Sequence, residues 1–335
     1  MSGHNSSIKG NPVPPALKAG GINISTPFFP APMDGVTIPA FRRLLKKLNK
    51  NAIGLTFTEF VNVNGITKSR LYRSKLTSRF LGENPLSVQI YGSDPDAMAS
   101  GASIVEKEGA DMIDLNFGCP ARKVVNNGSG SDLMRDLKRL AEIVKSVKSA
   151  VSIPVTAKCR TGWDKSSINV YKVAEIAELN GLSWLTIHGR TREMAYKGEA
   201  DWDIISEVKK NSGIPVIGNG DIDTPQKIIE AFQKYNVDGV MVGRAILRDP
   251  LIFTKAQTGK DIRLSAAEET AIFKDFADYM DEDGYTESGK LGKLKGFLAQ
   301  YSKGRQNSAR FRNLILRSQT IEDFFKNLSS FFSAT

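Results

Sequence analysis

A single cysteine in a short motif offers the most direct chemistry in this chain. Only two cysteines occur, Cys119 and Cys159, and Cys119 stands in the segment NFGCPARKV, with Arg122 and Lys123 close behind it. A thiol at such a point serves either as a nucleophile, which needs a nearby base, or as a proton donor. His188 is the only internal histidine, and no thiol–imidazole pair is evident, so we favour the proton donor. The two basic residues are suited to hold a substrate phosphate or to favour a thiolate.

Polar side chains end several of the apolar runs that recur along the chain. Catalytic residues of a parallel-stranded barrel lie at the carboxyl ends of its strands, so these positions form a candidate site. They are Gln89, Asn116, Lys158, His188, Asn219 and Arg244. The charge of Lys158 inside a strand requires a partner, either an electron-rich cofactor ring or a carboxylate such as Asp114. Cys159 would face the opposite side of that strand as a structural residue.

Two glycine-rich turns follow the last two apolar runs. Residues 218–221 read GNGD, and Gly243 directly precedes Arg244. Barrel enzymes often bind a phosphate after the seventh and eighth strands, through backbone N–H groups whose approach a side chain would block. The two turns, in this order, predict a phosphate site.

The elements that must position these residues alternate between strand-like and helix-like segments. The predicted helices are Asp96–Glu108, Asp132–Ser149, Asn169–Leu179, Asp203–Lys210 and Thr224–Tyr235, the last with Thr224 as N-cap and Pro225 at its first helical position. The eight predicted strands are Phe28–Met33, Ile53–Glu59, Leu86–Gly92, Met112–Gly118, Val155–Arg160, Trp184–Arg190, Val216–Asp221 and Gly239–Arg244.

This alternation predicts parallel strands with right-handed crossovers, and eight repeats over about 220 residues match an α/β fold of the (β/α)8, or TIM, barrel type. A doubly wound open sheet is the competing architecture, but the first run lacks the G-x-G-x-x-G fingerprint of a dinucleotide fold. We therefore expect a flexible lead-in over residues 1–21 and a barrel over residues 22–262.

The pattern changes near residue 263, where strand-like runs stop. Three helices are predicted in residues 263–335, at Ala266–Tyr279, Gly289–Lys303 and Thr320–Phe332. Residues 290–317 contain no acidic residue, and Phe297, Tyr301 and Phe311 are interleaved with eight cations. Such a run is typical of contacts to a phosphate backbone, although a solvated face is the alternative. The eight are Lys290, Lys293, Lys295, Lys303, Arg305, Arg310, Arg312 and Arg317.

A second basic segment follows the second predicted strand. It contains Lys68, Arg70, Arg73, Lys75 and Arg79. Basic residues at the mouth of a barrel suggest that a polyanion delivers the substrate, and solubility of a surface loop is the alternative.

Composition narrows the classes of protein further. The chain has 335 residues, 46 Lys and Arg, 36 Asp and Glu, and a formal net charge of +10. Two cysteines exclude a disulfide framework and a zinc site of paired C-x-x-C knuckles, and we expect no metal. No segment approaches the roughly 18 apolar residues of a membrane span, and the N-terminus lacks an apolar signal-type stretch, so a cytoplasmic location is expected.

Together these motifs resemble the tRNA-dihydrouridine synthases, flavoenzymes with an FMN-binding barrel. The likeness runs from about Phe29 to Phe253 and covers APMDGVT, FTEF, VQIYG, DLNFGCPARKV, the lysine of TAKCRTG, TIHGRTREMAYKGEADW, VIGNGDI and VMVGRAIL. The cysteine motif and the HGRT segment with its downstream ADW are the most specific, and a basic helical domain after the barrel also fits. In GVTIPAFR, Ile38 and Ala40 depart from the family's usual Asp and Pro, which leaves that loop only its backbone role.

The resemblance implies reduction of a uridine in tRNA at its C5–C6 bond. NADPH would reduce tightly bound FMN, the flavin would pass hydride to C6, and Cys119 would give the proton to C5. Lys158 would stabilise negative charge on the reduced ring, whose polar edge Gln89 also meets. The other residues implied at FMN are Pro32, Met33, Asp34, His188, Asn219, Gly220, Asp221, Gly243 and Arg244.

The resemblance also implies that the barrel mouth and the basic helical domain hold the RNA. A uracil reaches such a mouth only when it is turned out of its stack, and enzymes on bases offset that cost with backbone contacts and a stacking pocket. Residues expected at the mouth are Asn116, Arg122, Lys123, Arg160, Arg190 and Arg192, together with the eight cations named above.

Two other functions remain open from the sequence. A small-molecule FMN reductase, of the dihydroorotate dehydrogenase or enoate reductase type, would share the barrel but leaves the basic helices unexplained. A non-catalytic RNA-binding barrel would not need Lys158, Cys119 and both glycine turns. The uridine position and the RNA are not specified, ribosomal RNA included, and a monomer is the simplest expectation.

Overall fold

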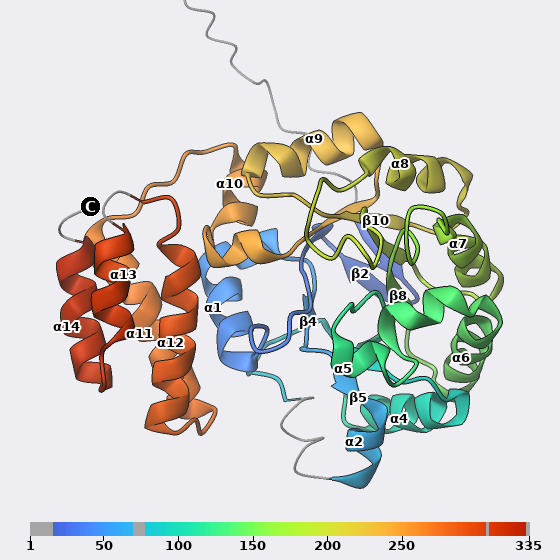
Figure 1. The fold of residues 1–335 in the computed structure, drawn as a ribbon, viewed down its shortest axis with the longest axis horizontal. Helices are drawn as coiled ribbons and strands as arrows, with labels where there is room; N and C mark the ends of the chain where they lie inside the picture. The colour runs from blue at the N-terminus through green and yellow to red at the C-terminus, as the bar shows by residue number, and fades with distance from the viewer. Residues whose placement is uncertain (1–15, 70–77, 306–307, 333–335) are drawn as a thin grey trace, which may run out of the picture.

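The computed structural model describes residues 16–69, 78–305 and 308–332 of the chain and has a parallel barrel at its centre (Figure 1). Its sheet follows the order β3-β11-β10-β9-β8-β7-β6-β4, with β5 paired to β6, and its pairings are all parallel. The predicted barrel is confirmed. Its strands are β3 Phe28–Pro30, β4 Thr56–Phe57, β5 Val61–Asn62, β6 Leu86–Tyr91, β7 Met112–Phe117, β8 Val155–Arg160, β9 Leu185–His188, β10 Val216–Asn219 and β11 Gly239–Val242.

The barrel is nearly closed between its first two strands. The N–H of Gly54, just before β4, donates to the carbonyl of Phe28 in β3 at 3.3 Å. A Cβ at position 54 would lie 1.9 Å from the carbonyl oxygen of Thr26, so this close approach requires glycine.

Helices follow the strands and form the outer ring. Several begin as local sequence rules predict: Asp94 and Thr224 cap helices whose first residue is proline, and the side chains of Asp136 and Asp201 also accept N-cap hydrogen bonds. The ring contains α1 Pro39–Asn49, α2 Val63–Lys68, α4 Pro95–Lys107, α5 Arg122–Val125, α6 Leu137–Ala150, α7 Val170–Leu179, α8 Trp202–Asn211, α9 Pro225–Tyr235 and α10 Ile252–Thr258, with short 3₁₀ turns η1 Lys50–Ala52, η2 Gly130–Arg135 and η3 Arg244–Leu247.

A hairpin closes the amino-terminal end of the barrel. Strands β1 Leu17–Ala19 and β2 Ile22–Ile24 pair antiparallel, and their buried residues join a cluster with Met112 and Trp184, which stand at the start of β7 and just before β9. Residues 17–19 were expected in a flexible lead-in, so that expectation does not hold for them, whereas residues 1–15 lie outside the described residues. Runs of three residues give no periodic signal, but burial against the barrel bottom stabilises them.

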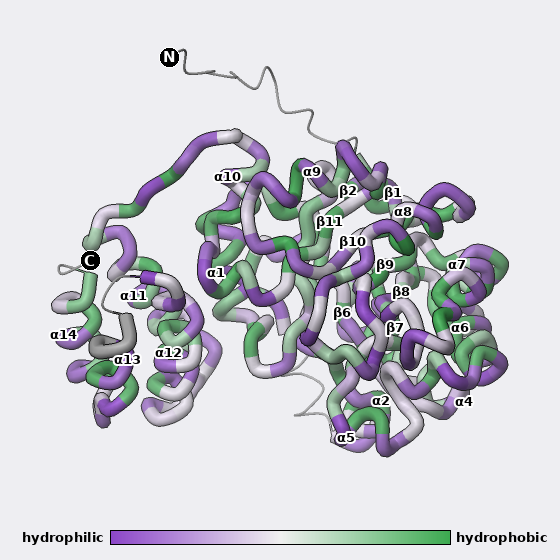
Figure 2. The backbone as a smooth tube through the Cα atoms, turned by 45° about the horizontal axis from the view of Figure 1, so that its top comes forward, coloured by the Kyte–Doolittle hydropathy of each residue, from purple (hydrophilic) through white to green (hydrophobic). Residues whose placement is uncertain are grey.

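Four helices form a bundle beside the barrel (Figures 1 and 2). It comprises α11 Ala266–Glu282, α12 Glu287–Tyr301, α13 Ser308–Leu316 and α14 Ile321–Phe332, and a mainly hydrophilic connection leads to it from α10. The expected boundary at residues 262 and 263 falls in this connection.

The bundle docks on α1. Phe41 of α1 packs edge-on against Phe276 and Phe297, with ring centroids 5.7 and 5.4 Å apart. Asp283 accepts a hydrogen bond from the backbone N–H of Ala40 at 2.9 Å. This N–H lies in the first turn of α1 and has no acceptor within the helix. Because α1 follows directly on the loop after β3, the bundle is held next to the barrel mouth.

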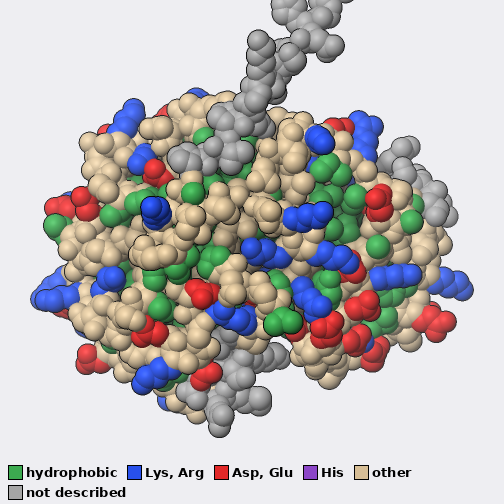
Figure 3. Space-filling model, turned by 180° about the vertical axis from the view of Figure 1, so that it is seen from behind, with side chains coloured by type: hydrophobic (Ala, Val, Ile, Leu, Met, Phe, Trp, Pro, Cys, Tyr) green, Lys and Arg blue, Asp and Glu red, His purple; other side chains and the backbone are tan. Residues whose placement is uncertain are grey.

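No described helix is long and apolar enough to cross a membrane. Of the second basic segment, Arg70, Arg73 and Lys75 lie outside the described residues, and Arg79 pairs with Asp111 at 3.2 Å. On the face opposite to that of Figure 1, several basic side chains gather near the middle, and acidic side chains lie mostly around and below them (Figure 3).

A candidate active site at the carboxyl ends of the strands

A cavity of about 810 Å³ lies at the carboxyl ends of the barrel strands, within the size range of small-molecule and cofactor sites. Residues from strands that are far apart in the sequence converge on it. Most of the residues predicted from sequence line this cavity: Pro32, Met33, Asp34, Gln89, Asn116, Cys119, Arg122, Lys158, Arg160, His188, Arg190, Arg192, Asn219, Gly220, Asp221, Gly243 and Arg244.

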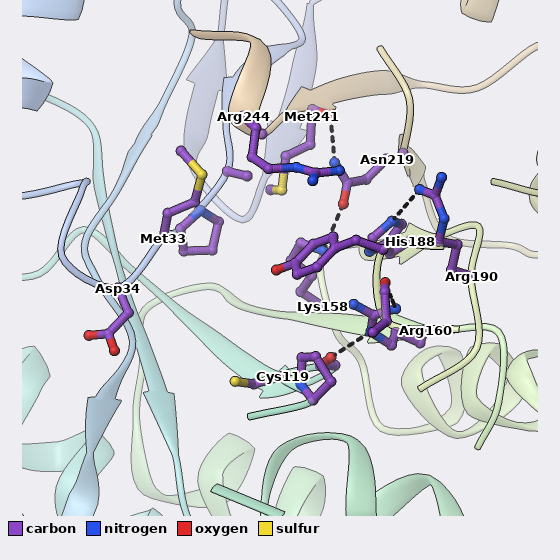
Figure 4. A pocket seen from close by; sticks show the side chains of 18 of the residues that line it. Met33, Asp34, Cys119, Lys158, Arg160, His188, Arg190, Asn219, Met241 and Arg244 are labelled. Atoms are coloured by element: carbon purple, nitrogen blue, oxygen red, sulfur yellow. Dashed lines mark hydrogen bonds between the residues drawn. The ribbon is translucent and has the colours of Figure 1, made fainter. Parts of the chain in front are cut away.

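The labelled side chains surround the cavity from several directions (Figure 4). Met33 and Asp34 lie on one side, and His188 and Arg190 lie on the other. Lys158 and Asn219 lie between these two sides, with Arg244 above Lys158 and Cys119 below it in this view. The thiol and the ammonium therefore belong to one site.

The turn that carries Cys119 is held by its own neighbours. The side-chain oxygen of Asn116 accepts hydrogen bonds from the N–H groups of Gly118 (3.1 Å) and Cys119 (2.9 Å). The carbonyl of Cys119 accepts from the N–H of Ser131 at 3.1 Å and from its hydroxyl at 3.0 Å. Gly130 has a φ of +62°, and a Cβ there would lie 2.9 Å from that same carbonyl. The thiol is thus presented by a turn that is fixed at both ends.

The thiol of Cys119 is held in its protonated form. The side chain is half-buried, and this desolvation raises its pKa, outweighing the backbone hydrogen bond from Ala121 and the charge of Arg160. Within the described residues no hydrogen bond joins it to an imidazole, and the ring of His188 contacts Arg190 at 3.4 Å. Cys159 is fully buried in the core, and desolvation raises its pKa to about 12, as expected for a structural residue.

Lys158 has an amide, not a carboxylate, as its partner. Its ammonium donates to the side-chain oxygen of Asn219 at 2.9 Å, and the amide nitrogen of Asn219 donates to the carbonyl of Met241 at 2.8 Å. Asp114, the alternative partner, accepts instead from Gln89 and Thr156. Burial, and secondly the charge of Arg160, lower the pKa of Lys158 to about 8. A mostly protonated ammonium therefore borders the cavity with no ion pair among the described residues.

The two turns place glycine in different surroundings, crowded at Gly220 and open at Gly243. Gly220 has a φ of +123°, and a Cβ there would meet Ala200 at 2.5 Å and the ring of His188 at 3.0 Å. At Gly243 the nearest atom to an added Cβ is 4.0 Å away, so a side chain would extend into the cavity. Beside it, the guanidinium of Arg244 lies 4.4 Å from the centroid of the Tyr196 ring.

Asp221 and Arg190 are partners of each other. Sequence reasoning placed Asp221 at a phosphate and Arg190 at a nucleotide, but both carboxylate oxygens lie 2.7 Å from one guanidinium nitrogen of Arg190. Arg190 is only 3% exposed, and it also donates to the carbonyls of Lys197 and Gly198. Asp221 further accepts from the N–H of Ala200 at 2.7 Å. Arg190 and Asp221 therefore form an ion pair within the wall of the cavity.

Arg160 connects two loops of the mouth. Its guanidinium donates at 2.9 Å to the carbonyls of Gly118, Thr191 and Ala195, which ties the cysteine turn to the loop after β9. Arg192 lies with its guanidinium 4.5 Å from the centroid of Trp163, and its buried Nε has no hydrogen-bond partner in the described structure. Such an orphaned donor at a cavity wall fits a site that binds an acceptor.

The cations of residues 290–317 are not all uncompensated, which corrects the expectation from the local sequence. Lys290 is buried and pairs with Asp281 and Glu287, both at 2.5 Å, and Arg305 pairs with Glu269 at 2.5 Å. The partners stand before the basic stretch in the sequence, so a local count of charge does not include them. The interleaved Phe297 and Tyr301 are buried core residues, and the side chain of Phe311 lies outside the described residues.

The other cations of this stretch have varied surroundings. Lys293 donates to the carbonyl of Gly35 at 2.5 Å, and Lys303 donates to Gln300 at 2.7 Å. Lys295 and Arg312 are half-buried, Arg317 is exposed, and the side chain of Arg310 lies outside the described residues. Lys123, at the mouth, pairs with Asp34 at 3.1 Å, and both are exposed. Of the eight cations, none of the seven whose side chains are described lines the cavity.

Three residues that sequence reasoning did not assign belong to the site or its support. Tyr196 lines the cavity with a ring 56% exposed, and its place in the HGRT–ADW segment could have identified it. Gln300 of α12 also lines the cavity, and only the docking of the bundle brings it there. Asp114 is fully buried beneath Gln89.

Comparisons with known proteins identify relatives over nearly the whole chain. The family described as "Dihydrouridine synthase (Dus)" matches residues 29–335. A "Probable tRNA-dihydrouridine synthase" of Rickettsia conorii is 39% identical over 312 residues, covering 89% of this chain and 91% of that protein. "tRNA-dihydrouridine synthase B" of Xanthomonas axonopodis pv. citri is 36% identical over 321 residues, covering 91% and 92%. Histamine dehydrogenase from Rhizobium sp. 4-9, 14% identical with a TM-score of 0.57 over 80% of this chain and 51% of that one, shares the fold.

Proposed function

The chain belongs to the dihydrouridine synthase family, and we propose that it reduces the C5–C6 double bond of a uridine in tRNA with FMN as cofactor and NADPH as reductant. Membership of this family makes it an oxidoreductase and a flavin enzyme. The two relatives named as tRNA-dihydrouridine synthases align with about nine tenths of the chain.

One observation carries the proposal. A protonated thiol and an ammonium with no ion pair border the same cavity. The first is suited to give a proton, and the second is suited to stabilise negative charge that arises on an electron carrier.

The residues present fit FMN. Lys158 supplies the cation, Gly243 leaves space for close approach of a phosphate to backbone, and Arg244 adds a guanidinium beside Gly243. Pro32, Met33 and Asp34 also line the cavity, and a flat ring is proposed to pack against their backbone. Reduced FMN held by these residues would supply the hydride for C6 of the uracil.

His188 and Gln89 are proposed to complete the cofactor site. Burial and the nearby cations lower the pKa of His188 well below its usual range, so it stays neutral and acts as a hydrogen-bonding group. Gln89 uses one N–H of its amide on Asp114 and its oxygen on Asn116, which leaves one N–H for the edge of a ring. Asn219 fixes the direction of the Lys158 ammonium.

Cys119 is proposed to give its thiol proton to C5 as hydride reaches C6, so that one hydride and one proton saturate the double bond. The raised pKa keeps this proton in place near neutral pH, and the thiolate left behind recovers a proton from water. Arg160 and Asn116 hold the turn that presents this thiol to the cavity.

The RNA is proposed to lie across the mouth and the bundle. A uracil turned out of its stack would reach the cavity past Tyr196 and Gln300, and the exposed cations Arg122, Lys123 and Arg317 would contact phosphates. Lys295, Lys303, Arg310 and Arg312 remain proposed RNA contacts, as does Arg192 at the mouth. A monomer in the cytoplasm remains an expectation.

The test is an absorbance spectrum of the purified protein. It is recorded anaerobically after addition of NADPH and again after addition of tRNA that lacks modifications. The visible flavin band is expected to bleach with NADPH and to recover with this RNA, and the RNA is then expected to contain dihydrouridine. Recovery with orotate or an enone but not with RNA would instead identify a small-molecule reductase. A protein that binds no flavin even with added FMN would exclude both enzymes.

A further inference from the structure

Three buried side chains connect the barrel interior to the turn of Cys119. The carboxylate of Asp114 accepts a hydrogen bond from Nε2 of Gln89 at 2.5 Å. The amide oxygen of Gln89 accepts from Nδ2 of Asn116 at 2.7 Å. The amide oxygen of Asn116 then accepts from the N–H groups of Gly118 and Cys119. Asp114 and Gln89 are at most 1% exposed and Asn116 is 7% exposed, so water does not compete for these bonds.

The strands place these residues in contact. Gln89 in β6 pairs in register with Asp114 in β7, and Asn116 follows two residues later on the same face of β7. Thr156 in β8 pairs with Asp114 from the other side, where its hydroxyl donates to the second carboxylate oxygen at 2.6 Å. The carboxylate is therefore bound once toward the cysteine turn and once away from it.

The direction of this chain of hydrogen bonds is fixed at its two ends, by a carboxylate that only accepts and by backbone N–H groups that only donate. A primary amide both donates and accepts, so Gln89 and Asn116 could be reversed together and still bond to one another. An ionised carboxylate only accepts, so it requires the N–H side of Gln89. Gln89 then offers its oxygen to Asn116, and Asn116 keeps its own oxygen for the turn. Reversal of both amides would bring the NH₂ group of Asn116 against two backbone N–H groups.

We propose that Asp114 is a positioning residue that orients the amides of Gln89 and Asn116 and thereby holds the turn presenting Cys119. It touches neither substrate nor cofactor, and its relevance to catalysis rests on the proposed role of Cys119 as proton donor. Asp114 is ionised at pH 8, where the test is made, because burial raises its pKa only to about 6.

The first test measures the rate at which iodoacetamide alkylates Cys119 at pH 8 in the flavin-loaded protein. Cys159 does not compete, since it is buried and its pKa is raised to about 12. In Asp114→Val the turn is released and the thiol gains access to water. Alkylation is then expected to be faster by about tenfold, the change in thiolate fraction produced by a fall of one unit in pKa.

Two variants control for a loss of structure. Asp114→Asn keeps an oxygen for Gln89 and directs its NH₂ group to the Thr156 hydroxyl, so alkylation is expected at the parent rate. Thr156→Val removes the hydrogen bond on the side away from the cysteine, and the parent rate is expected again. Parent-like alkylation of Asp114→Val would contradict the proposal, and so would equal acceleration in Thr156→Val, because that would indicate general loosening.

The double variant Asp114→Val/Thr156→Val covers the case in which the single variant does not fold. Its two apolar side chains face each other and leave only the Gln89 N–H unpartnered, which costs less than two orphaned groups. The same tenfold acceleration is expected. This test is independent of the proposed function, because alkylation needs no RNA. If the Asp114 variants were alkylated faster but Cys119→Ala still reduced RNA at the normal rate, Asp114 would keep its positioning role and Cys119 would not be the proton donor.

Discussion

The ammonium of Lys158 and the side-chain oxygen of Asn219 are 2.9 Å apart, and within the described part of the chain no carboxylate forms an ion pair with this lysine. The neutral partner leaves the positive charge available to whatever enters the cavity. Burial lowers the pKa of Lys158 to about 8, so the charge is present at pH 7 and declines above pH 8.

Replacing this lysine is expected to make bound FMN harder to reduce. In Lys158→Met the loss of about 1.4 kcal/mol of charge stabilisation corresponds to a midpoint potential about 30 mV more negative for a two-electron couple. Spectroelectrochemical titration at pH 7 measures this shift. The difference from the parent should shrink above pH 8, where the parent lysine loses its proton. Equal potentials at pH 7 would exclude Lys158 as the stabilising charge.

Cys119→Ala is expected to separate the two halves of the reaction. NADPH should still bleach the flavin at the parent rate, because the thiol takes no part in that step. Recovery with RNA should fall by about 10²- to 10⁴-fold, the range of a positioned general acid. In the parent enzyme this step should be constant through neutral pH and decline only at alkaline pH, because desolvation raises the thiol pKa and the protonated form is required. Stopped-flow absorbance follows both steps, and a parent-like recovery rate in the variant would disprove the role.

Asp221→Asn is expected to destabilise the protein because it leaves Arg190 buried without its carboxylate. Breaking a fully buried pair costs about 3–5 kcal/mol, and since Asp221 is partly exposed a loss of about 2 kcal/mol is expected. Asp223→Asn is the matched control, because its pair with Lys227 is about half exposed and should contribute less than about 1 kcal/mol. Denaturant titration in excess FMN compares the two variants, and equal midpoints would show that the Arg190 pair is not structural.

The barrel could be predicted because its strands are buried on both faces and separated by helices, a pattern visible along a single chain. The hairpin of residues 17–24 could not, since three-residue strands become stable only against the barrel bottom. Helix α1 was not predicted either: its buried face includes Arg42, whose charge is neutralised by Glu83, 41 residues away. Long-range partners of this kind leave no local signal.

The same physical reason limits prediction of the site. Lys158 and Cys119 could be identified from their positions at or just after strand ends, because the backbone of a barrel brings the carboxyl ends of its strands together independently of the side chains. The partners of those residues depend on tertiary contacts. Asp221 and Arg190 were assigned to two different ligands although they bind each other, and Lys290 was counted as uncompensated although Asp281 lies 2.5 Å away.

The salt dependence of RNA binding should distinguish exposed cations of the bundle from paired ones. Each phosphate contact that is lost reduces the slope of log K against log salt by about 0.7 to 0.9. Arg317→Ala is expected to show such a reduction, since Arg317 is exposed. Arg305→Ala should leave the slope unchanged, because its guanidinium is held by Glu269 and lies over the rings of Tyr301 and Phe332. Filter binding at several salt concentrations gives both slopes, and identical slopes for the two variants would contradict this division.

Asp114→Asn is expected to stabilise the protein at neutral pH while leaving its hydrogen bonds in place. Burial raises the pKa of Asp114 to about 6 from the usual value near 4, so the native state binds a proton more tightly than the unfolded state. Stability contributed by this group is therefore full below about pH 4 and is lost as pH rises through 6. The asparagine carries no charge to desolvate. The melting temperature of the variant should therefore exceed that of the parent by several degrees at pH 7 to 8, and the difference should vanish toward pH 4. Thermal unfolding across this range makes the comparison, and a difference that stays constant with pH would show that titration of Asp114 is not its cause.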